Sequence, residues 1–259
     1  MIELDAAGRA CGKAHRWVGL RGALEARETA ALRSWTEDLE QRPETPGRWM
    51  KYFEPGDARL LCRVENFLPY HAELRSLLSR RDLFACLAEL LGEPPVLFKE
   101  KLNFKLPGGA GFAPHQDAPA FTSFSQTYHI TLMLGADATT PENGCLELVD
   151  GFDRPETLPQ ADDGTLREDV VARLAWHPLP TEPGDVVLFD SYVPHRSGPN
   201  RTAAPRRALY VTYNRASEGD RRDEYFALKR RAFPPECERV PGAPIDPTSR
   251  VFNLGNPIR

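Results

Sequence analysis

Hydrophobic positions in the first third of the chain recur at the spacing of amphipathic helices. Residues 23–41 carry apolar side chains at near-helical intervals, and Pro43 follows as a stop signal. Residues 70–91 repeat the pattern and are followed by Gly92 and by Pro94. We therefore predict two helices, over 23–41 and 70–91, each with its apolar face packed against the rest of the protein.

From residue 96 the period of the hydrophobic pattern changes to two, which is typical of a β-strand. One face carries the apolar side chains of Val96, Phe98, Leu102, Phe104 and Leu106. The other face carries Lys99, Lys101, Asn103 and Lys105. Further strand-like runs, each bounded by Gly, Pro, Asn or Asp, cover residues 129–134, 145–149, 185–189 and 208–213.

Helices in front of many short strands predict a mainly β fold, a barrel or sandwich with a helical flank. We expect one domain, because no linker-like stretch divides the chain. Its predicted parts are a helical flank over about 1–95, a strand core over about 96–214 and a charged, proline-broken tail over 215–259. The polar, acidic stretch 158–173 is expected to form a long loop or a lid.

Composition narrows the classes of protein that remain. With 259 residues, 41% of them hydrophobic, the chain can bury a sizeable core, and its 24 prolines favour short strands and loops over a helical bundle. The 33 basic and 37 acidic residues leave a net charge of −4. A non-specific nucleic-acid binder or a polybasic membrane binder is therefore not expected.

The cysteines and the amino terminus indicate a cytoplasmic protein. The five cysteines are odd in number, far apart and never in a C-x-x-C pair: Cys11, Cys62, Cys86, Cys145 and Cys237. This pattern argues against a disulfide scaffold or a zinc-cysteine site and favours a reducing compartment. Residues 1–22 lack the apolar segment of a signal peptide, and no apolar run is long enough to predict a membrane span.

The strongest local signal for chemistry is the run from Phe112 to Asp117, Phe-Ala-Pro-His-Gln-Asp. On an extended chain the side chains of His115 and Asp117 share one face. The imidazole and the carboxylate are then close enough to bind the same metal ion. His195, just after a buried-looking strand, supplies a second imidazole. Two histidines and one carboxylate form a facial triad, which leaves three positions on Fe(II) open. The alternatives are a surface turn in which Asp117 caps a neighbour, and a strand-end His195 with ordinary partners.

Arg206 opens the strand-like run that follows His195. It has the same parity as Tyr210, Thr212 and Asn214, so one strand can present a polar row to a ligand. The guanidinium of Arg206 can pair with one carboxylate of a dicarboxylate whose other end chelates the metal. This arrangement is the signature of a 2-oxoglutarate site. The alternative is an ordinary solvent arginine, since Arg207 lies next to it.

The ordered motifs make the chain similar to the phytanoyl-CoA dioxygenase family of Fe(II)/2-oxoglutarate oxygenases. They occur in the family's order between about residues 96 and 214. The matching stretches are 114–117 (Pro-His-Gln-Asp), 142–151 (Glu-Asn-Gly-Cys-Leu-Glu-Leu-Val-Asp-Gly), 183–189 (Pro-Gly-Asp-Val-Val-Leu-Phe), 195–200 (His-Arg-Ser-Gly-Pro-Asn) and Arg206.

The resemblance implies a double-stranded β-helix core, also called a jelly-roll or cupin-like core, with Fe(II) held by His115, Asp117 and His195. It also implies that Arg206 and Ser197 bind the far carboxylate of 2-oxoglutarate. Lys105 matches a further lysine of the family near that carboxylate, and Asn103 on the same face is assigned to the co-substrate as well. Such an enzyme uses O2 and releases succinate and CO2. Related halogenases replace the carboxylate ligand, so Asp117 favours hydroxylation.

The lysine-rich face of the strand from residue 96 has two interpretations. It is a solvated outer face, or it points into the barrel mouth while the opposite apolar face packs under the helices. In the second case Lys99 and Lys101 exceed what one 2-oxoglutarate needs, which predicts an anionic substrate such as a phosphonate, phosphate ester or carboxylate. His129 and Thr131 on the next strand line the same pocket or serve in packing.

Glycine-rich stretches predict turns rather than a phosphate-binding loop. Residues 108–111 open no helix, so we expect a flexible hairpin connection there, and Gly144 is expected to supply a positive φ in a turn.

Three functional alternatives to a hydroxylase stay open on the sequence. The same core can perform desaturation, epimerisation or ring formation, it can be a non-catalytic metal-containing jelly-roll binding protein, or the metal can be zinc in a hydrolase. The segments 233–236 and 251–258 are similar to segments in bacterial members of the family that hydroxylate 2-aminoethylphosphonate. The expected partner is a small molecule, and neither a nucleic acid nor a membrane is expected.

Overall fold

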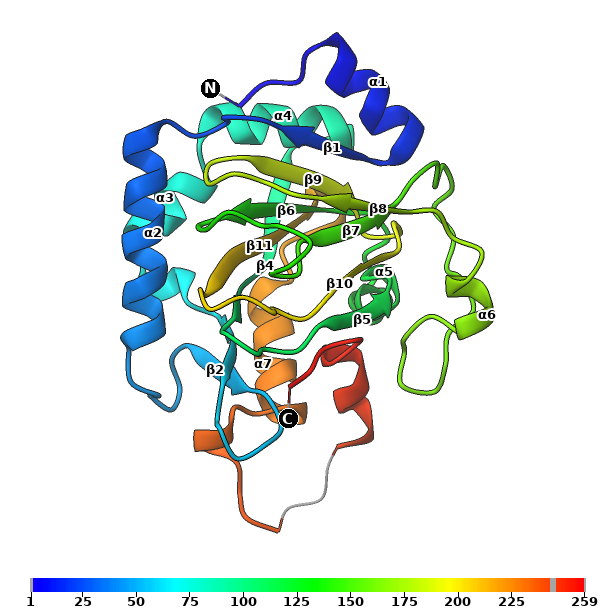
Figure 1. The fold of residues 1–259 in the computed structure, drawn as a ribbon. Helices are drawn as coiled ribbons and strands as arrows, with labels where there is room; N and C mark the ends of the chain where they lie inside the picture. Colours follow the sequence, from blue (N-terminus) through cyan, green and yellow to red (C-terminus); the bar gives the residue numbers. More distant parts are fainter. Residues whose placement is uncertain (1, 243–245, 259) are drawn as a thin grey trace.

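The computed structural model describes residues 2–242 and 246–258 and consists of two antiparallel sheets that face each other, with helices on the outside (Figure 1). The larger sheet has the order β1-β9-β6-β11-β4-β3-β2 and the smaller sheet has the order β5-β10-β7-β8. The strands of the larger sheet are β1 (Trp17–Leu20), β2 (Met50–Phe53), β3 (Leu61–Glu65), β4 (Pro95–Lys105), β6 (His129–Gly135), β9 (Val186–Asp190) and β11 (Arg206–Arg215). Those of the smaller sheet are β5 (Phe112–His115), β7 (Leu146–Val149), β8 (Trp176–Leu179) and β10 (His195–Ser197).

Three helices pack on the outer face of the larger sheet, namely α2 (Ala26–Gln41), α3 (Ala72–Leu78) and α4 (Arg81–Leu91). The other described helices are α1 (Ala6–His15), α5 (Ala118–Phe121), α6 (Glu168–Val171) and α7 (Arg222–Ala232). In the described ranges, none of them combines the length and apolar character that crossing a bilayer requires. The mainly β fold with flanking helices is confirmed.

Alternation along the strands of the larger sheet separates two cores. Outward-facing side chains pack under α2, α3 and α4, and they include Leu102, Phe104, Leu132, Leu188, Leu209 and Val211. Inward-facing side chains pack against the smaller sheet, and they include Met133, Val187, Phe189 and Tyr210. An aromatic cluster with Phe98, Phe121, Phe124, Tyr225 and Phe252 lies where α7 and the C-terminal segment cover the inner face. The polar side chains of β4 lie between these inner clusters, so they are enclosed by protein.

The predicted helix over 70–91 is wrong in its continuity, because it consists of α3 and α4. Arg80 has an extended backbone, with φ −61° and ψ 145°, and it separates the two helices. The Asp82 carboxylate accepts hydrogen bonds from Leu83 N and from the Arg80 guanidinium at this break. A continuous amphipathic helix needs an apolar side chain in each helical turn, but the four residues from Ser79 to Asp82 are all polar. The sequence itself therefore indicates the break between α3 and α4.

The predicted apolar face of β4 is wrong at its N-terminal end because of a β-bulge. Thr212 pairs with Lys99 while Tyr213 pairs with Leu97, so Phe98 is an extra residue on β4. Phe98 therefore turns inward to the aromatic cluster, and Leu97 packs on the outer side instead. The bulge leaves the predicted lysine face on the inner side of the sheet.

The boundaries of the flank and the tail also need correction. The segment predicted as a helical flank contributes β1, β2 and β3 to the larger sheet. The predicted tail contains α7, whose buried side chains Tyr225, Phe226 and Lys229 follow helical spacing. Residues 108–111 do not close a hairpin, because β4 and β5 belong to different sheets. Gly144 has the predicted positive φ, 76°.

Candidate metal centre and co-substrate site

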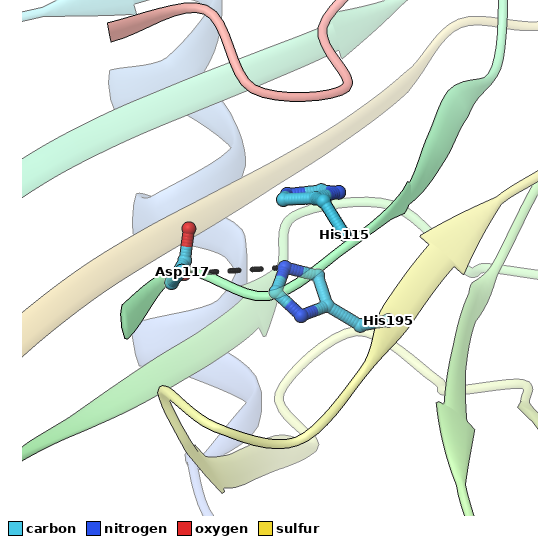
Figure 2. A group of neighbouring side chains, drawn as sticks. All are labelled: His115, Asp117 and His195. Carbon is cyan, nitrogen blue, oxygen red and sulfur yellow. Dashed lines mark ion pairs between the residues drawn. The ribbon is translucent and has the colours of Figure 1, made fainter. Parts of the chain in front are cut away.

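Strands β5 and β10 bring His115, Asp117 and His195 together. His115 and His195 are direct partners across the two antiparallel strands, and Asp117 follows two residues after His115. One ligand atom from each of the three buried residues lies within 4.8 Å of the others (Figure 2). The sequence spacing of two between His115 and Asp117 thus brings both side chains to one side, where β10 supplies the third.

Gln116 holds this short stretch in place, because its side chain reaches neighbouring loops. Its amide nitrogen donates to the carbonyl oxygens of Glu156 at 2.9 Å and Tyr192 at 2.5 Å, and its oxygen accepts from Leu158 N at 2.8 Å. Gln116 is fully buried, so these bonds are shielded from competing water. The residue between two candidate ligands therefore anchors them to the loop before β10 and to the segment 156–158.

Both histidines present a nitrogen without a proton to the shared space. His115 Nδ1 lies 2.7 Å from Ala113 O, and His195 Nδ1 lies 3.0 Å from Val193 O, so each Nδ1 carries the proton and donates to a carbonyl. Burial lowers the pKa of both imidazoles below their usual value, and the neighbouring His195 lowers that of His115 further. Neutral imidazoles with a free Nε2 are the form that binds a metal ion.

Asp117 completes a ligand set suited to a divalent cation. Burial by itself raises the pKa of this carboxyl, but the ammonium groups of Lys101 and Lys99 outweigh it and the net shift is downward. Its Oδ2 is buried and accepts no hydrogen bond from any described residue, and it lies 3.9 Å from His195 Nε2. A buried, ionised oxygen without a partner next to two imidazoles fits a metal ligand.

A second unsatisfied group lies at the other end of the inner face. Arg206 is 1% exposed, and Nη2 donates to Gly144 O, while Nε and Nη1 have no partner in the described part of the chain. Arg207 points to the outer side, where it pairs with Asp137 at 2.8 Å. Of the two adjacent arginines, Arg206 thus has free donors toward the interior, which fits a carboxylate.

Lys105 lies beside Arg206, across the β4–β11 pair, and fastens the surrounding loops. Its Nζ donates to Ser197 Oγ at 2.7 Å, to Gly144 O at 3.2 Å and to Gly198 O, so all three of its donors are used. Burial, helped by the charge of Arg206, lowers the pKa of Lys105 to about 6. The structure therefore brings Lys105 and Ser197 to the Arg206 end of the site.

The predicted lysine face points inward, so the alternative of a solvated outer face is wrong. Lys99 and Lys101 are 8% and 9% exposed, and both line a pocket of about 20 Å³ together with His115 and Asp117. Neither ammonium group has a hydrogen bond or an ion pair with a described residue, and Lys99 Nζ lies 4.3 Å from the centre of the Phe121 ring. Burial lowers the pKa of Lys101 to about 7.

The other predicted ligand-binding residues are bonded to protein neighbours. Asn103 Oδ1 accepts from Arg63 Nε at 2.9 Å, so its assignment to the co-substrate stays a prediction. His129 Nε2 lies 3.0 Å from Gln126 Oε1, and the Thr131 hydroxyl lies 3.0 Å from that of Thr212. Burial lowers the pKa of His129 to about 3, so this side chain is neutral. His129 and Thr131 face the interior, where their polar groups contact Gln126 and Thr212, and their binding of substrate stays a prediction.

Comparison with known proteins places this site in a family. Residues 17–208 match the phytanoyl-CoA dioxygenase (PhyH) family. The chain belongs to the phytanoyl-CoA dioxygenase family. It is 51% identical to the 2-aminoethylphosphonate dioxygenase of an uncultured bacterium over 250 residues, which cover 95% of each chain. It is 43% identical to the methylphosphonate hydroxylase of Gimesia maris, over 84% of this chain and 83% of that one.

A solved structure supports the fold assignment. The crystal structure of EctD from S. alaskensis with 2-oxoglutarate and 5-hydroxyectoine superimposes with a TM-score of 0.73, at 21% identity, over 83% of this chain and 77% of that one. The two facing sheets are therefore the jelly-roll core of this family. The protein is an Fe(II)/2-oxoglutarate-dependent dioxygenase, and its cofactor and co-substrates are Fe(II), 2-oxoglutarate and O2.

Several pocket residues escaped the sequence analysis of this family member. Arg63, Glu65 and Tyr225 are buried and line the pocket, and Asn256 lines it while only partly buried. Lys229 is buried behind the pocket, where its Nζ donates to Glu65 Oε2. The period-two pattern of residues 61–65 and the helical spacing of residues 225–232 signalled their elements. Charged side chains are mostly solvated, so nothing local marks the inward direction of Arg63 or Lys229.

Proposed function

We propose that the protein hydroxylates a small phosphonate. The observation that carries this proposal is the pocket in which the buried cations Arg63, Lys99 and Lys101 lie next to Asp117. Buried cations without enough carboxylate partners favour an anionic ligand. The names of the two relatives support the class of anion, since one is a 2-aminoethylphosphonate dioxygenase and the other a methylphosphonate hydroxylase.

In this proposal the two ends of the inner face have different tasks. His115, Asp117 and His195 hold Fe(II), and Arg206 with Ser197 binds the far carboxylate of 2-oxoglutarate, with Lys105 positioning Ser197 through their hydrogen bond. The bound metal supplies oxidising chemistry, which converts 2-oxoglutarate and O2 to succinate and CO2 and transfers one oxygen atom to the substrate. Lys99 and Lys101, which are 8% and 9% exposed, hold the anionic group of the substrate beside Asp117.

The activity test is aerobic incubation with Fe(II), 2-oxoglutarate and either 2-aminoethylphosphonate or methylphosphonate. We expect succinate formation that depends on the phosphonate, with a product heavier by one oxygen atom. A product lighter by two hydrogen atoms would instead indicate desaturation. A protein that binds iron but forms no succinate with any substrate of a broad panel would be a binding protein.

Replacing Lys101 by alanine is expected to raise the KM for the phosphonate by about thirtyfold, because losing one partner of a buried charge pair costs on the order of 2 kcal/mol. The slow turnover of 2-oxoglutarate without substrate is expected to stay nearly intact. Steady-state kinetics with varied phosphonate measure both. Lys13→Ala, on the exposed surface of α1, is the matched control. An unchanged KM in Lys101→Ala would remove Lys101 from the substrate site.

We also propose a cytoplasmic location and no nucleic-acid partner. All five cysteines are free thiols, which fits a reducing compartment. The net charge of −4 fits a protein that acts on a small molecule rather than on a polyanion.

A further inference from the structure

The C-terminal segment, residues 251–258, lies directly against the candidate metal ligands. Ala113 N donates to Gly255 O at 2.8 Å, which joins this segment to β5 two residues before His115, and Figure 1 shows the red segment beside that strand. Gly255 has φ +62°, and a Cβ on it would lie 2.8 Å from His115 Nδ1. Only glycine permits this approach, so the segment is fitted closely to the site.

Apolar contacts hold the same segment down. Phe252 is 4% exposed and its ring lies 5.6 Å from that of Tyr225 on α7, while Ile258 is 5% exposed. The segment also supplies part of the pocket lining, through Val251, Phe252, Leu254 and Asn256. It is therefore a wall of the candidate substrate pocket rather than a loose end.

Asn256 of this segment contacts Arg63. Its Nδ2 donates to Leu254 O at 2.8 Å, which turns its Oδ1 toward Arg63, and Arg63 Nη2 donates to that oxygen. The Arg63 guanidinium is further bonded through Nε to Asn103 Oδ1 at 2.9 Å and through Nη1 to Glu65 Oε1 at 3.3 Å. Three side chains from β3, β4 and the C-terminal segment thus fix the plane of Arg63.

These contacts leave Arg63 with donors for a ligand. A guanidinium has five N–H groups, and the bonds within the described chain use three of them. One N–H remains on each terminal nitrogen, which is the fork that binds two oxygens of a phosphonate, phosphate or carboxylate. Arg63 is 2% exposed and lines the pocket that also contains Asp117, so such an anion would lie close to the metal centre.

The balance of charge around the pocket favours an anion as well. Glu65 is fully buried, and its Oε2 accepts from Lys229 Nζ at 2.5 Å. Lys229 and Glu65 therefore compensate each other, and Asp117 is assigned to the metal. Arg63, Lys99 and Lys101 remain as a cationic surplus within the described part of the site.

The C-terminal segment is also the part of the pocket lining with the least regular structure. Much of the wall is made by strands of the two sheets or by α7, whereas residues 251–258 form no helix longer than a short 3-10 turn and no strand. The C-terminal segment is the part of the wall that can open at the lowest cost.

We propose that Arg63, positioned by Asn256 of the C-terminal segment, binds the anionic head group of the substrate, and that this segment closes over the pocket once the substrate has entered. The inference rests on the proposed function for the identity of the anion. It assigns Arg63 to the substrate, Asn256 to the positioning of Arg63, and residues 251–258 to the active site.

The test uses Arg63→Gln and Asn256→Ala, with Arg33→Gln on exposed α2 as the matched control. Binding of 2-aminoethylphosphonate to the Fe(II)- and 2-oxoglutarate-loaded enzyme is measured by anaerobic calorimetry, together with kcat, KM and iron content. We expect Kd and KM to rise about thirtyfold in Arg63→Gln and about fivefold in Asn256→Ala. Iron content and 2-oxoglutarate turnover without substrate are expected to stay at the level of the control. Hydrogen exchange of residues 251–258 is expected to slow when the phosphonate binds.

Unchanged Kd and KM in both variants would overturn the inference. Loss of iron and of 2-oxoglutarate turnover together with phosphonate binding would also overturn it, since Arg63 would then be structural. Should Arg63→Gln fail to fold, Asn256→Ala decides the question, because Asn256 is only partly buried and lies in no helix or strand. A wild-type enzyme that turns over no phosphonate would contradict the proposed function instead. Arg63 is then tested with inorganic phosphate as the bound anion, and the same changes in Kd are expected.

Discussion

The His115→Ala variant is expected to lose iron and, with it, the 2-oxoglutarate-dependent formation of succinate. The three candidate ligand atoms lie within 4.8 Å of one another, so removing one imidazole leaves two ligands and an open side. Mutation of residues that merely support metal ligands costs about 10- to 100-fold in affinity, and loss of a ligand is expected to exceed about a hundredfold. Iron content after anaerobic reconstitution and succinate release measure the two effects.

The matched control for this experiment is His177→Ala. His177 lies on β8 with its side chain 47% exposed, and its ring stacks on Trp17 away from the metal centre. We expect normal iron content and normal turnover in that variant. If His115→Ala retained both iron and succinate formation, the assignment of the metal site would be wrong.

Much of the candidate metal site followed from the sequence because local geometry determines it. A spacing of two on an extended chain brings His115 and Asp117 to the same side whatever the rest of the fold is. His195 and Arg206 required more, namely that separate strands meet, and the order of motifs along the family's core supplied that information. The structure brings all four residues to the inner face.

The proposed substrate side could not be predicted from the sequence in the same way. Arg63 and Lys229 are charged, and charged residues are mostly solvated, so nothing local marks them as buried. Their buried polar groups find partners on other elements, since Arg63 on β3 bonds to Asn103 on β4 and Lys229 on α7 bonds to Glu65 on β3. Asn256 reaches the site through a chain end without regular pattern, which no periodicity argument detects.

The errors in the predicted fold have a similar origin. The bulge at Phe98 changes which side chains of β4 face inward. The alternating pattern in the sequence does not show where a strand contains such an extra residue. The hairpin expected at residues 108–111 is a crossing between the sheets, since turn chemistry identifies a turn but not the strands that it joins. Long-range pairing, rather than local preference, decided both features.

Replacing Arg206 by glutamine is expected to raise the KM for 2-oxoglutarate by about a hundredfold or more. The guanidinium is 1% exposed, and its Nε and Nη1 have no partner among the described residues, so a bound carboxylate would pair with a fully desolvated cation. Removing one partner of such a pair costs on the order of 3 kcal/mol, and about 1.4 kcal/mol corresponds to a factor of ten. Succinate formation at varied 2-oxoglutarate measures the change, and iron content is expected to stay normal because Arg206 is no metal ligand.

The neighbouring Arg207 provides the control that separates charge from position. Arg207→Gln removes the same charge one residue away, but its partners Asp137 and Glu37 lie on the outer side of the sheet. We expect Arg207→Gln to lower the melting temperature while leaving the KM for 2-oxoglutarate unchanged. We expect Arg206→Gln to raise that KM while leaving the melting temperature nearly unchanged. A similar KM in both variants would mean that the co-substrate carboxylate binds elsewhere. Arg206 and Arg207 are the same type of residue, but successive residues of a strand point to opposite faces. A difference in KM between the two variants therefore reports the direction in which each side chain points from β11.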